Sequence, residues 1–210
     1  MEVLKVMKNE ESKLEQAMEL ALQSAILFNK IAHNGKSVSE YTSTELIDAL
    51  NLQTDITSEE CKEWQDFVDV DSVEELDAVV DVIYTHGYLE YLVKEFNSRD
   101  IEIADTLKLR RLQHTRTISE YIMNSINFTD EVVLEATKRV IENNEQKFTK
   151  DSEEFAKWES SFSRKTVEVD GEYYYFLSDV NGKVRKKENF EKVLLDDLIE
   201  KMVEKDNVKT

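Results

Sequence analysis

Proline is absent from the 210 residues of this chain, and glycine occurs only four times. Both residues interrupt helices, so their scarcity permits long, unbroken helical segments. Charged residues make up 34% of the chain, which suits amphipathic helices with solvated outer faces. Hydrophobic residues make up 40% of the chain and include nine Phe, eight Tyr and two Trp, which is enough for a folded core. We therefore expect one sizeable, mainly α-helical domain.

Cysteine occurs once, at Cys61, which excludes an intramolecular disulfide and fits a reducing compartment. No run of about 18 apolar residues exists, and the first residues lack the apolar core of a signal peptide. A net charge of −18 argues against a nucleic-acid duplex as partner, because phosphate contacts need a positive surface. It leaves open a nucleotide that carries its own Mg²⁺. These features predict a soluble, cytoplasmic protein that contacts neither membrane nor nucleic acid.

Two short acidic clusters stand out between residues 57 and 87. They are E-E-x-x-E, at Glu59, Glu60 and Glu63, and E-x-x-D-x-x-x-D, at Glu74, Asp77 and Asp81. Helical residues three or four apart share a face, so each cluster presents carboxylates on one side of a helix. Two such faces turned toward each other repel unless a divalent cation lies between them. Oxygen ligands from two helices suit Mg²⁺ or Mn²⁺, so the spacing suggests a metal site.

Helix capping is the alternative explanation for part of this acidity. Thr57 followed by Glu60, and Ser72 followed by Glu75, both match the capping-box pattern, and acids in a first helical turn favour the helix dipole. Capping accounts for Glu59, Glu60, Glu74 and Glu75. It does not account for Glu63, Asp77 or Asp81, which lie beyond a first turn. Residue spacing alone leaves both interpretations open.

Apolar spacing and turn residues predict the remaining elements. We expect helices over residues 11–32, 43–50, 58–68, 73–96, 101–126, 129–143, 152–161 and 193–204. A β-hairpin is expected over 166–177 about Asp170-Gly171, with a second turn at Asn181-Gly182 leading into 183–186. Gly87 within a helix predicts a close helix crossing. The apolar stripe from Leu14 to Phe28 can bury against the acidic helices or against another copy of the chain.

Four sequence segments together resemble a known family. They are E-E-C-K-E (59–63), E-E-L-D-A-V-V-D-V-I-Y-T-H-G (74–87), N-x-x-K-F (144–148) and N-G-K-V-R-K-K-E-N-F (181–190). In this order they resemble the MazG-like all-α nucleoside triphosphate pyrophosphohydrolases, related to the phosphoribosyl-ATP pyrophosphohydrolases. The likeness is strongest to the single-domain members common in phages. The gap between the two acidic segments is short for the family.

The resemblance implies a fold and a domain organisation. It implies a mainly α protein with a MazG-like four-helix-bundle core, an inserted helical segment and a small C-terminal β-meander. Residues 1–163 would form the helical catalytic domain, with 97–128 as the insertion. Residues 164–210 would form the β-meander and a C-terminal helix packed on the same domain. The family assembles as homodimers or homotetramers, and the stripe of the first helix offers a surface for that contact.

The implied activity is Mg²⁺-dependent hydrolysis of a nucleoside triphosphate, deoxynucleotides in particular, to the monophosphate and pyrophosphate. Mn²⁺ is the alternative cation, and the host cytoplasm is the expected location if a phage encodes the chain. Carried over from the family, the metal ligands are Glu60, Glu63, Glu74 and Asp77. Glu59, Glu60 and Glu63 are the catalytic acids. The residues expected to contact substrate are Asp81, Tyr84, Asn144 and Lys147.

A second function class remains open beside the enzyme. The chain is alternatively a non-catalytic, acidic helical interaction protein of a phage, whose carboxylates bind a basic partner. The basic residues Arg110 and Arg111 and the cluster 183–187 are weaker phosphate-binding candidates. More often such groups balance neighbouring acids on a solvated face.

Overall fold

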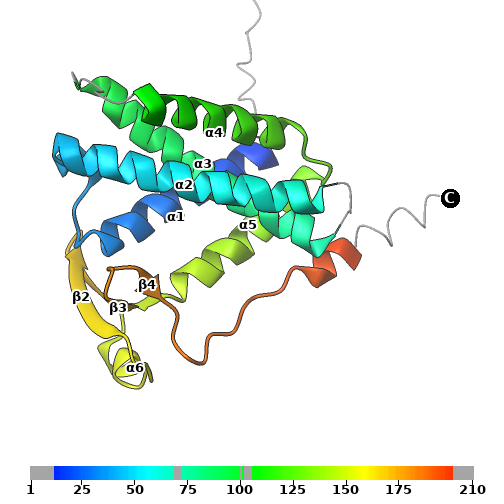
Figure 1. Ribbon diagram of the computed structural model, residues 1–210. Coiled ribbons are helices and arrows are strands. Elements are labelled where there is room, and N and C mark those ends of the chain that lie inside the picture. The colour runs from blue at the N-terminus through cyan, green and yellow to red at the C-terminus, as the bar shows by residue number, and fades with distance from the viewer. Residues whose placement is uncertain (1–11, 69–71, 100, 102–105, 201–210) are drawn as a thin grey trace, which may run out of the picture.

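The computed structural model describes residues 12–68, 72–99, 101 and 106–200, with side chains left aside for 106–110. Over these residues the protein is mainly helical, with a small antiparallel sheet at one end (Figure 1). The helices are α1 (Lys13–Ala32), α2 (Ser43–Phe67), α3 (Val73–Ser98), α4 (Thr106–Asn124), α5 (Asp130–Glu145) and α6 (Ser152–Ala156). The strands are β1 (Phe148–Thr149), β2 (Ser163–Val169), β3 (Glu172–Ser178) and β4 (Val184–Arg185). None of the helices described is long and apolar enough to cross a membrane.

Helix α3 is the centre of the molecule. Its sequence is apolar on nearly every face, which is typical of a helix surrounded by protein. Helices α1, α2, α4 and α5 all pack against it. A Cβ atom at Gly87 would lie 3.7 Å from the Cβ of Leu22, so α1 passes close to α3 at this glycine. The predicted close crossing is confirmed.

Helix α1 ends at Ala32, as its sequence predicts, and begins at Lys13, two residues later than expected. Ser12 and Glu15 form a capping box at its start. After Ala32 the chain turns through left-handed conformations at Asn34 (φ 58°) and Gly35 (φ 81°). The middle of the apolar stripe, at Ala17, Ala21 and Ala25, is buried within the chain, as α1 packs on α3 and α5. The middle of the stripe is therefore buried in the protein's own core.

Helix α2 corrects the prediction of two separate helices over 43–50 and 58–68. It is a single helix of 25 residues that begins after a capping box formed by Thr42 and Glu45. The apolar period breaks in its middle because polar side chains take the buried positions there. Gln53 donates from Nε2 to the Thr85 carbonyl of α3 at 2.8 Å, and Thr54 bonds back to its own helix at 2.6 Å. Satisfied polar groups can replace apolar ones in a core, which hides the helix from hydrophobic spacing.

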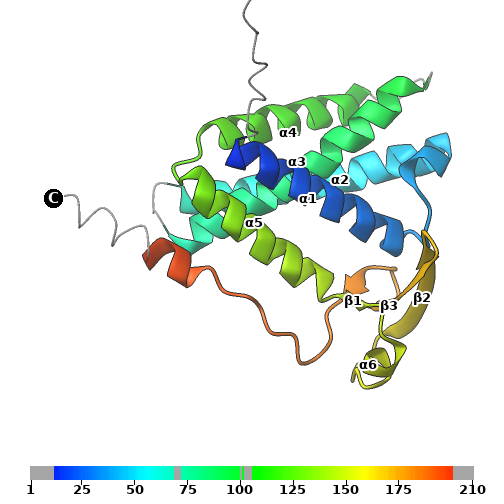
Figure 2. The same cartoon turned by 180° about the vertical axis from the view of Figure 1, so that it is seen from behind.

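Helix α4 lies on α2 and α3, on the opposite side of α3 from α5 (Figures 1 and 2). Two of its basic residues pair with acids of the helices beneath. Arg116 forms a two-pronged ion pair with Glu90, and Arg111 pairs with Asp55 at 2.8 Å. Arg111 was a phosphate-binding candidate, but its guanidinium group is already paired with a carboxylate. The side chain of Arg110 lies outside the described residues.

The sheet follows the predicted hairpin. Strands β2 and β3 pair antiparallel about Asp170 and Gly171, both with positive φ, which confirms the turn. The segment after Asn181-Gly182 pairs with β3 as β4. Strand β1 completes the sheet and was not predicted, while α6 is shorter than the expected helix 152–161. The sheet packs on the C-terminal end of α1, where Ile31 is fully buried.

The last described segment returns to the helical core. Residues 196–200 are helical, and Leu195 and Leu198 are buried in the same cluster as α1, α2, α3 and α5. The predicted helix over 193–204 therefore starts later than expected. Its residues 201–204 lie outside the described part of the chain.

Candidate functional site

The hairpin formed by α2 and α3 puts the acidic clusters side by side. Helix α2 ends at Phe67 and α3 begins at Val73, so the last turns of α2 run antiparallel to the first turns of α3. Glu60 and Glu63 come from α2, and Asp77 and Asp81 come from α3. Glu60 and Asp81 are partly buried, whereas Glu63 is exposed. These four residues are called the carboxylate cluster below.

The members of the carboxylate cluster repel one another. Burial raises the pKa of Glu60 to about 7, and the charges of Glu63, Glu59 and Asp77 raise it further. Burial also raises the pKa of Asp81 to about 8, with Glu60 and Asp77 adding to the shift. No residue that the structure describes donates a hydrogen bond to the Asp81 carboxyl group. The cluster is therefore a concentration of negative charge with little internal compensation.

The capping explanation fails on α2 and holds in part on α3. Thr57 lies in the interior of α2, fully buried, and its hydroxyl has no hydrogen-bond partner among the described residues. Glu60 and Glu63 thus lie toward the C-terminal end of α2, where the helix dipole disfavours anions and the last turn has no basic residue. On α3, Ser72 does cap the helix by accepting from the Glu75 amide at 3.0 Å.

The structure brings together some of the predicted ligands and not others. Glu74, an expected ligand, is exposed in the first turn of α3 and is not among the acids that act on Glu60 or Asp81. Asp81, expected to contact substrate, joins the cluster instead, one helical turn beyond Asp77. Glu59 is exposed beside Glu60 and contributes to its raised pKa.

Asp77 already has a cationic partner. The Nζ atom of Lys192 donates to Oδ2 of Asp77 at 2.6 Å. Lys192 is a residue that the sequence analysis did not select, and no motif spacing marks it. In the ranges that the structure describes, no three or more Asp, Glu, His or Cys side chains converge closely enough to hold a metal ion. The donor set has the chemistry that Mg²⁺ prefers, but its oxygens would have to turn toward one another to bind the ion.

The remaining predicted residues border the carboxylate cluster. The Tyr84 hydroxyl lies 3.4 Å from the Ser24 hydroxyl, and burial raises its pKa; Asp81 acts in the same direction. Lys147, just after α5, donates to Oδ1 of Asn144 at 2.5 Å and lies over the ring of Phe28. Burial lowers the pKa of Lys147 to about 8, the charge of Lys186 lowers it further, and Asp81 opposes the shift. Lys147 thus interacts electrostatically with Asp81, one acid of the cluster.

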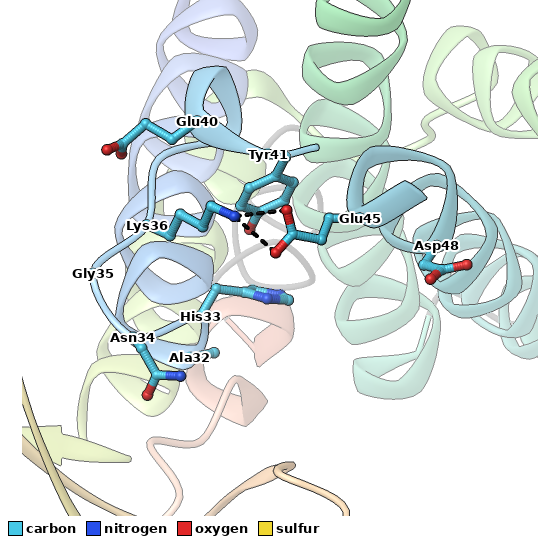
Figure 3. Close-up of a pocket in the computed structure, with 9 residues that line it drawn as sticks. All are labelled: Ala32, His33, Asn34, Gly35, Lys36, Glu40, Tyr41, Glu45 and Asp48. Carbon is cyan, nitrogen blue, oxygen red and sulfur yellow. Dashed lines mark hydrogen bonds and ion pairs between the residues drawn. The ribbon is translucent and has the colours of Figure 1, made fainter. Parts of the chain in front are cut away.

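A separate pocket lies at the other end of α2 and contains none of these residues. It measures about 620 Å³ and is lined by Ala32, His33, Asn34, Gly35, Lys36, Glu40, Tyr41, Glu45 and Asp48. Figure 3 shows Lys36 reaching across Tyr41 to the Glu45 carboxylate, an ion pair of 2.6 Å. That pair, with the Thr42 amide, lowers the pKa of Glu45 to about 2. Lys36 and Glu45 neutralise each other, and none of the predicted site residues lines this pocket, so we do not assign it the chemistry.

Comparison of the chain with protein-family models, with curated proteins and with solved structures gave no match.

Proposed function

We propose that the chain is a Mg²⁺-dependent pyrophosphohydrolase that converts nucleoside triphosphates, deoxynucleotides in particular, to monophosphates and pyrophosphate. The observation that carries the proposal is the carboxylate cluster on two antiparallel helices, in which burial and the neighbouring carboxylates raise the pKa values of Glu60 and Asp81. Stability alone does not favour such an arrangement, whereas a divalent cation relieves it. The resemblance of the sequence motifs to the MazG-like family points to the same chemistry.

The corresponding fold is a MazG-like four-helix bundle made of α1, α2, α3 and α5. These helices share one buried cluster that includes Ala17, Trp64, Val79 and Ala136, and Ile122 of α4 reaches the same cluster. In this assignment α4 is the inserted element, since it packs on the outer side of α2 and α3. A dimer or tetramer would have to use surfaces other than the buried part of the α1 stripe, such as the exposed Met18 and Leu20.

Glu60, Glu63 and Asp77 are the residues that would hold the cation, with Asp81 or Glu74 as a further ligand. When bound, Mg²⁺ neutralises phosphate oxygens and lowers the pKa of a bound water. The ligands come from two rigid helices, which restricts where the polyphosphate can lie. Lys147 meets the negative charge of the phosphates, and Asn144 fixes the direction of its ammonium group.

The reaction breaks the anhydride bond between the α- and β-phosphates as water adds to phosphorus. The water loses a proton, which a carboxylate must accept. Glu59 is free for this role because it lies at the edge of the cluster and is exposed to solvent. The Tyr84 hydroxyl and Asp81 lie on the more buried side of the cluster.

One observation favours a second candidate function, a non-catalytic helical protein that binds a basic partner. Lys192 neutralises Asp77 from within the chain, as a lysine of a basic partner would. In this alternative the remaining acids of the cluster receive further cationic side chains. It predicts no turnover with any nucleotide and binding that weakens as salt increases.

A substrate screen separates the two candidates. Purified protein is incubated with each ribo- and deoxynucleoside triphosphate in Mg²⁺, and pyrophosphate and orthophosphate are measured separately. We expect pyrophosphate from at least one nucleotide, lost on adding EDTA and restored by Mg²⁺. Release of orthophosphate alone, or no product from any nucleotide, would contradict the proposal.

A further inference from the structure

A smaller cavity lies where α1, α3 and the segment between α1 and α2 meet. It adjoins the pocket of Figure 3, with which it shares Lys36 and Tyr41, and its volume is about 230 Å³. Much of its wall is aromatic or aliphatic and is supplied by Ile26, Leu27, Val38, Tyr41, Tyr88 and Tyr91. It is called the tyrosine pocket below.

The wall that carries Tyr41 is anchored to the end of α3. Tyr41 directly follows the short 3₁₀ helix η1 (Val38–Glu40). The guanidinium group of Arg99 donates to the Val38 carbonyl at 2.8 Å and to the Tyr41 carbonyl. Tyr88 and Tyr91, on the facing wall, belong to α3 itself. Both walls are thus fixed to one helix, and a preformed pocket reduces the cost of ordering a ligand.

The hydroxyl group of Tyr41 is buried without a hydrogen bond. Tyr41 is 5% exposed, and its hydroxyl oxygen has no hydrogen-bond partner among the described residues. Burial raises the pKa of Tyr41 and Tyr88 opposes that shift, but the two hydroxyl groups do not meet in hydrogen-bonding geometry. The Tyr41 phenol therefore stays protonated, with an O–H group to donate. Buried polar groups in proteins normally have a partner, so this hydroxyl marks a position where one is missing.

The lysines that line the tyrosine pocket already have partners. Lys30 binds Asp170 at 2.6 Å, and Lys36 binds Glu45 at 2.6 Å. An ionic ligand would have to compete with these partners, whereas a neutral ligand would not. The rings of Tyr88 and Tyr91 lie 6.1 Å apart and are tilted by 31°, and they offer apolar surface to a flat molecule. The lining therefore favours a neutral, planar ligand.

The volume of the pocket limits the size of that ligand. An apolar cavity of about 150 Å³ holds benzene, whereas drug-sized ligands occupy pockets of roughly 300–1,000 Å³. The tyrosine pocket, at about 230 Å³, lies between these sizes. One substituted ring or a small fused pair of rings fits it.

We propose that the tyrosine pocket binds a small neutral aromatic molecule whose polar atom accepts a hydrogen bond from the Tyr41 hydroxyl. The ring of the ligand packs against Tyr88 and Tyr91. None of the four residues of the carboxylate cluster lines this pocket. The inference therefore goes beyond the proposed hydrolase activity and does not depend on it.

The test compares two probes of the same shape, phenol and toluene, of which phenol alone can accept the hydrogen bond. Their dissociation constants are measured by NMR titration of the full chain. The ratio of the two affinities is the readout, because the different hydration of the free probes cancels when proteins are compared. In Tyr41→Phe the preference for phenol over toluene should fall about tenfold, since the buried hydroxyl is gone. Tyr121→Phe is the matched control, because it removes a tyrosine hydroxyl from a side chain of α4 that is 63% exposed. It should keep the wild-type ratio.

A second variant tests the place of binding. Leu27→Trp puts a larger side chain into the wall, so neither probe should bind. Binding that survives Leu27→Trp, or an unchanged ratio in Tyr41→Phe, would overturn the proposal. So would a wild-type protein that binds neither probe, which is the result expected if an ordered water alone satisfies Tyr41. Thermal unfolding checks that each variant folds, and if Leu27→Trp does not, the ratio in Tyr41→Phe decides.

Discussion

The two ends of α2 carry acids in opposite electrostatic situations. Near its start, Glu45 completes a capping box with Thr42 and binds Lys36, so its pKa falls to about 2. Near its end, Glu60 lies among other carboxylates, and its pKa rises to about 7. The first acid agrees with the helix dipole, and the second opposes it. Two acids of one helix thus differ in pKa because a lysine lies beside the first, whereas burial and other carboxylates act on the second.

The ion pairs at the two ends of α2 show the same difference between a neutralised acid and a partly neutralised one. Lys36–Glu45 and Lys192–Asp77 both measure 2.6 Å. The first pair is complete, because two oxygens of Glu45 are bound by Lys36. The second compensates the cluster only in part: Lys192 opposes the raised pKa of Asp81, but burial, Glu60 and Asp77 outweigh it. The following predictions change one end of α2 and use the other as the reference.

The largest effect is expected on activity. Glu63→Gln or Asp77→Asn keeps the side-chain shape but removes a ligand charge. Pyrophosphate release should fall by at least about 100-fold. Glu45→Gln, at the opposite end of the same helix, should leave activity unchanged. Equal activity in all four proteins, measured with the best nucleotide of the screen, would refute the site.

The next effect concerns stability at the pocket end. Gly35 has φ +81°, and a Cβ atom there would lie 2.5 Å from the Glu168 carbonyl oxygen. We expect Gly35→Ala to lower the free energy of unfolding by about 1–3 kcal/mol, from clash and backbone strain. Gly182→Ala is the control: its φ is the same, but nothing lies within 4 Å of the added atom, so its loss should be smaller. Urea unfolding of both variants gives the comparison, and equal losses would contradict it.

The acids at the two ends of α2 should also make the stability of the protein depend on pH in opposite directions. Glu60 and Asp81 have pKa values raised from 4.5 and 3.8, so the folded protein binds more protons than the unfolded chain between about pH 4 and 8. Their contribution to stability is full below that window and is lost as pH rises through it. Glu45, with a lowered pKa, contributes above its ordinary value of 4.5 and loses that contribution as pH falls toward 2.

Thermal unfolding in EDTA measures this difference. From about pH 5 to pH 8 the wild-type Tm should decline more steeply than that of the double variant Glu60→Gln, Asp81→Asn. The double variant should be the more stable protein at the upper end of that range. Parallel curves for the two proteins would show that the cluster is not strained by its own charge.

The smallest effect is expected for Glu45→Gln on stability. Its ion pair with Lys36 is solvent-exposed, and such pairs contribute little. We expect a slight decrease of Tm at neutral pH that vanishes below about pH 3, where the carboxylate is increasingly protonated. A decrease of similar size in Lys36→Met would identify the pair as its origin. A large decrease in either variant would mean that the ion pair stabilises the fold more than its solvent exposure indicates.

Local rules predicted much of the fold. The start and end of α1, the hairpin at Asp170-Gly171 and the close crossing at Gly87 all follow from residue preferences that act over a few positions. The full length of helix α2 did not follow from such preferences, because Gln53 and Thr57 occupy buried positions that hydrophobic spacing assigns to apolar residues. Strand β1 was missed because two residues carry no periodic signal.

The candidate site was predictable to the same extent. Spacing identified Glu60, Glu63 and Asp77, and helix phase placed them on facing helices. The family resemblance selected Glu74 as the fourth ligand, whereas in the structure Glu60 and Asp77 act on Asp81. Spacing did not separate the two, since both share a face with Asp77. Lys192 was beyond reach, because it lies 115 residues from its partner.

By itself, the sequence determined which segments form helices and hairpins and which carboxylates share a helix face, because these depend on neighbours within one or two turns. The tertiary structure decided which acids repel one another and which lysines pair with them. It also decided that Glu45 has a cationic partner, whereas Glu60 lies among other carboxylates. Those outcomes depend on burial and on charges brought together from distant segments, and the strength of a charge interaction is set by the distance and medium between the groups.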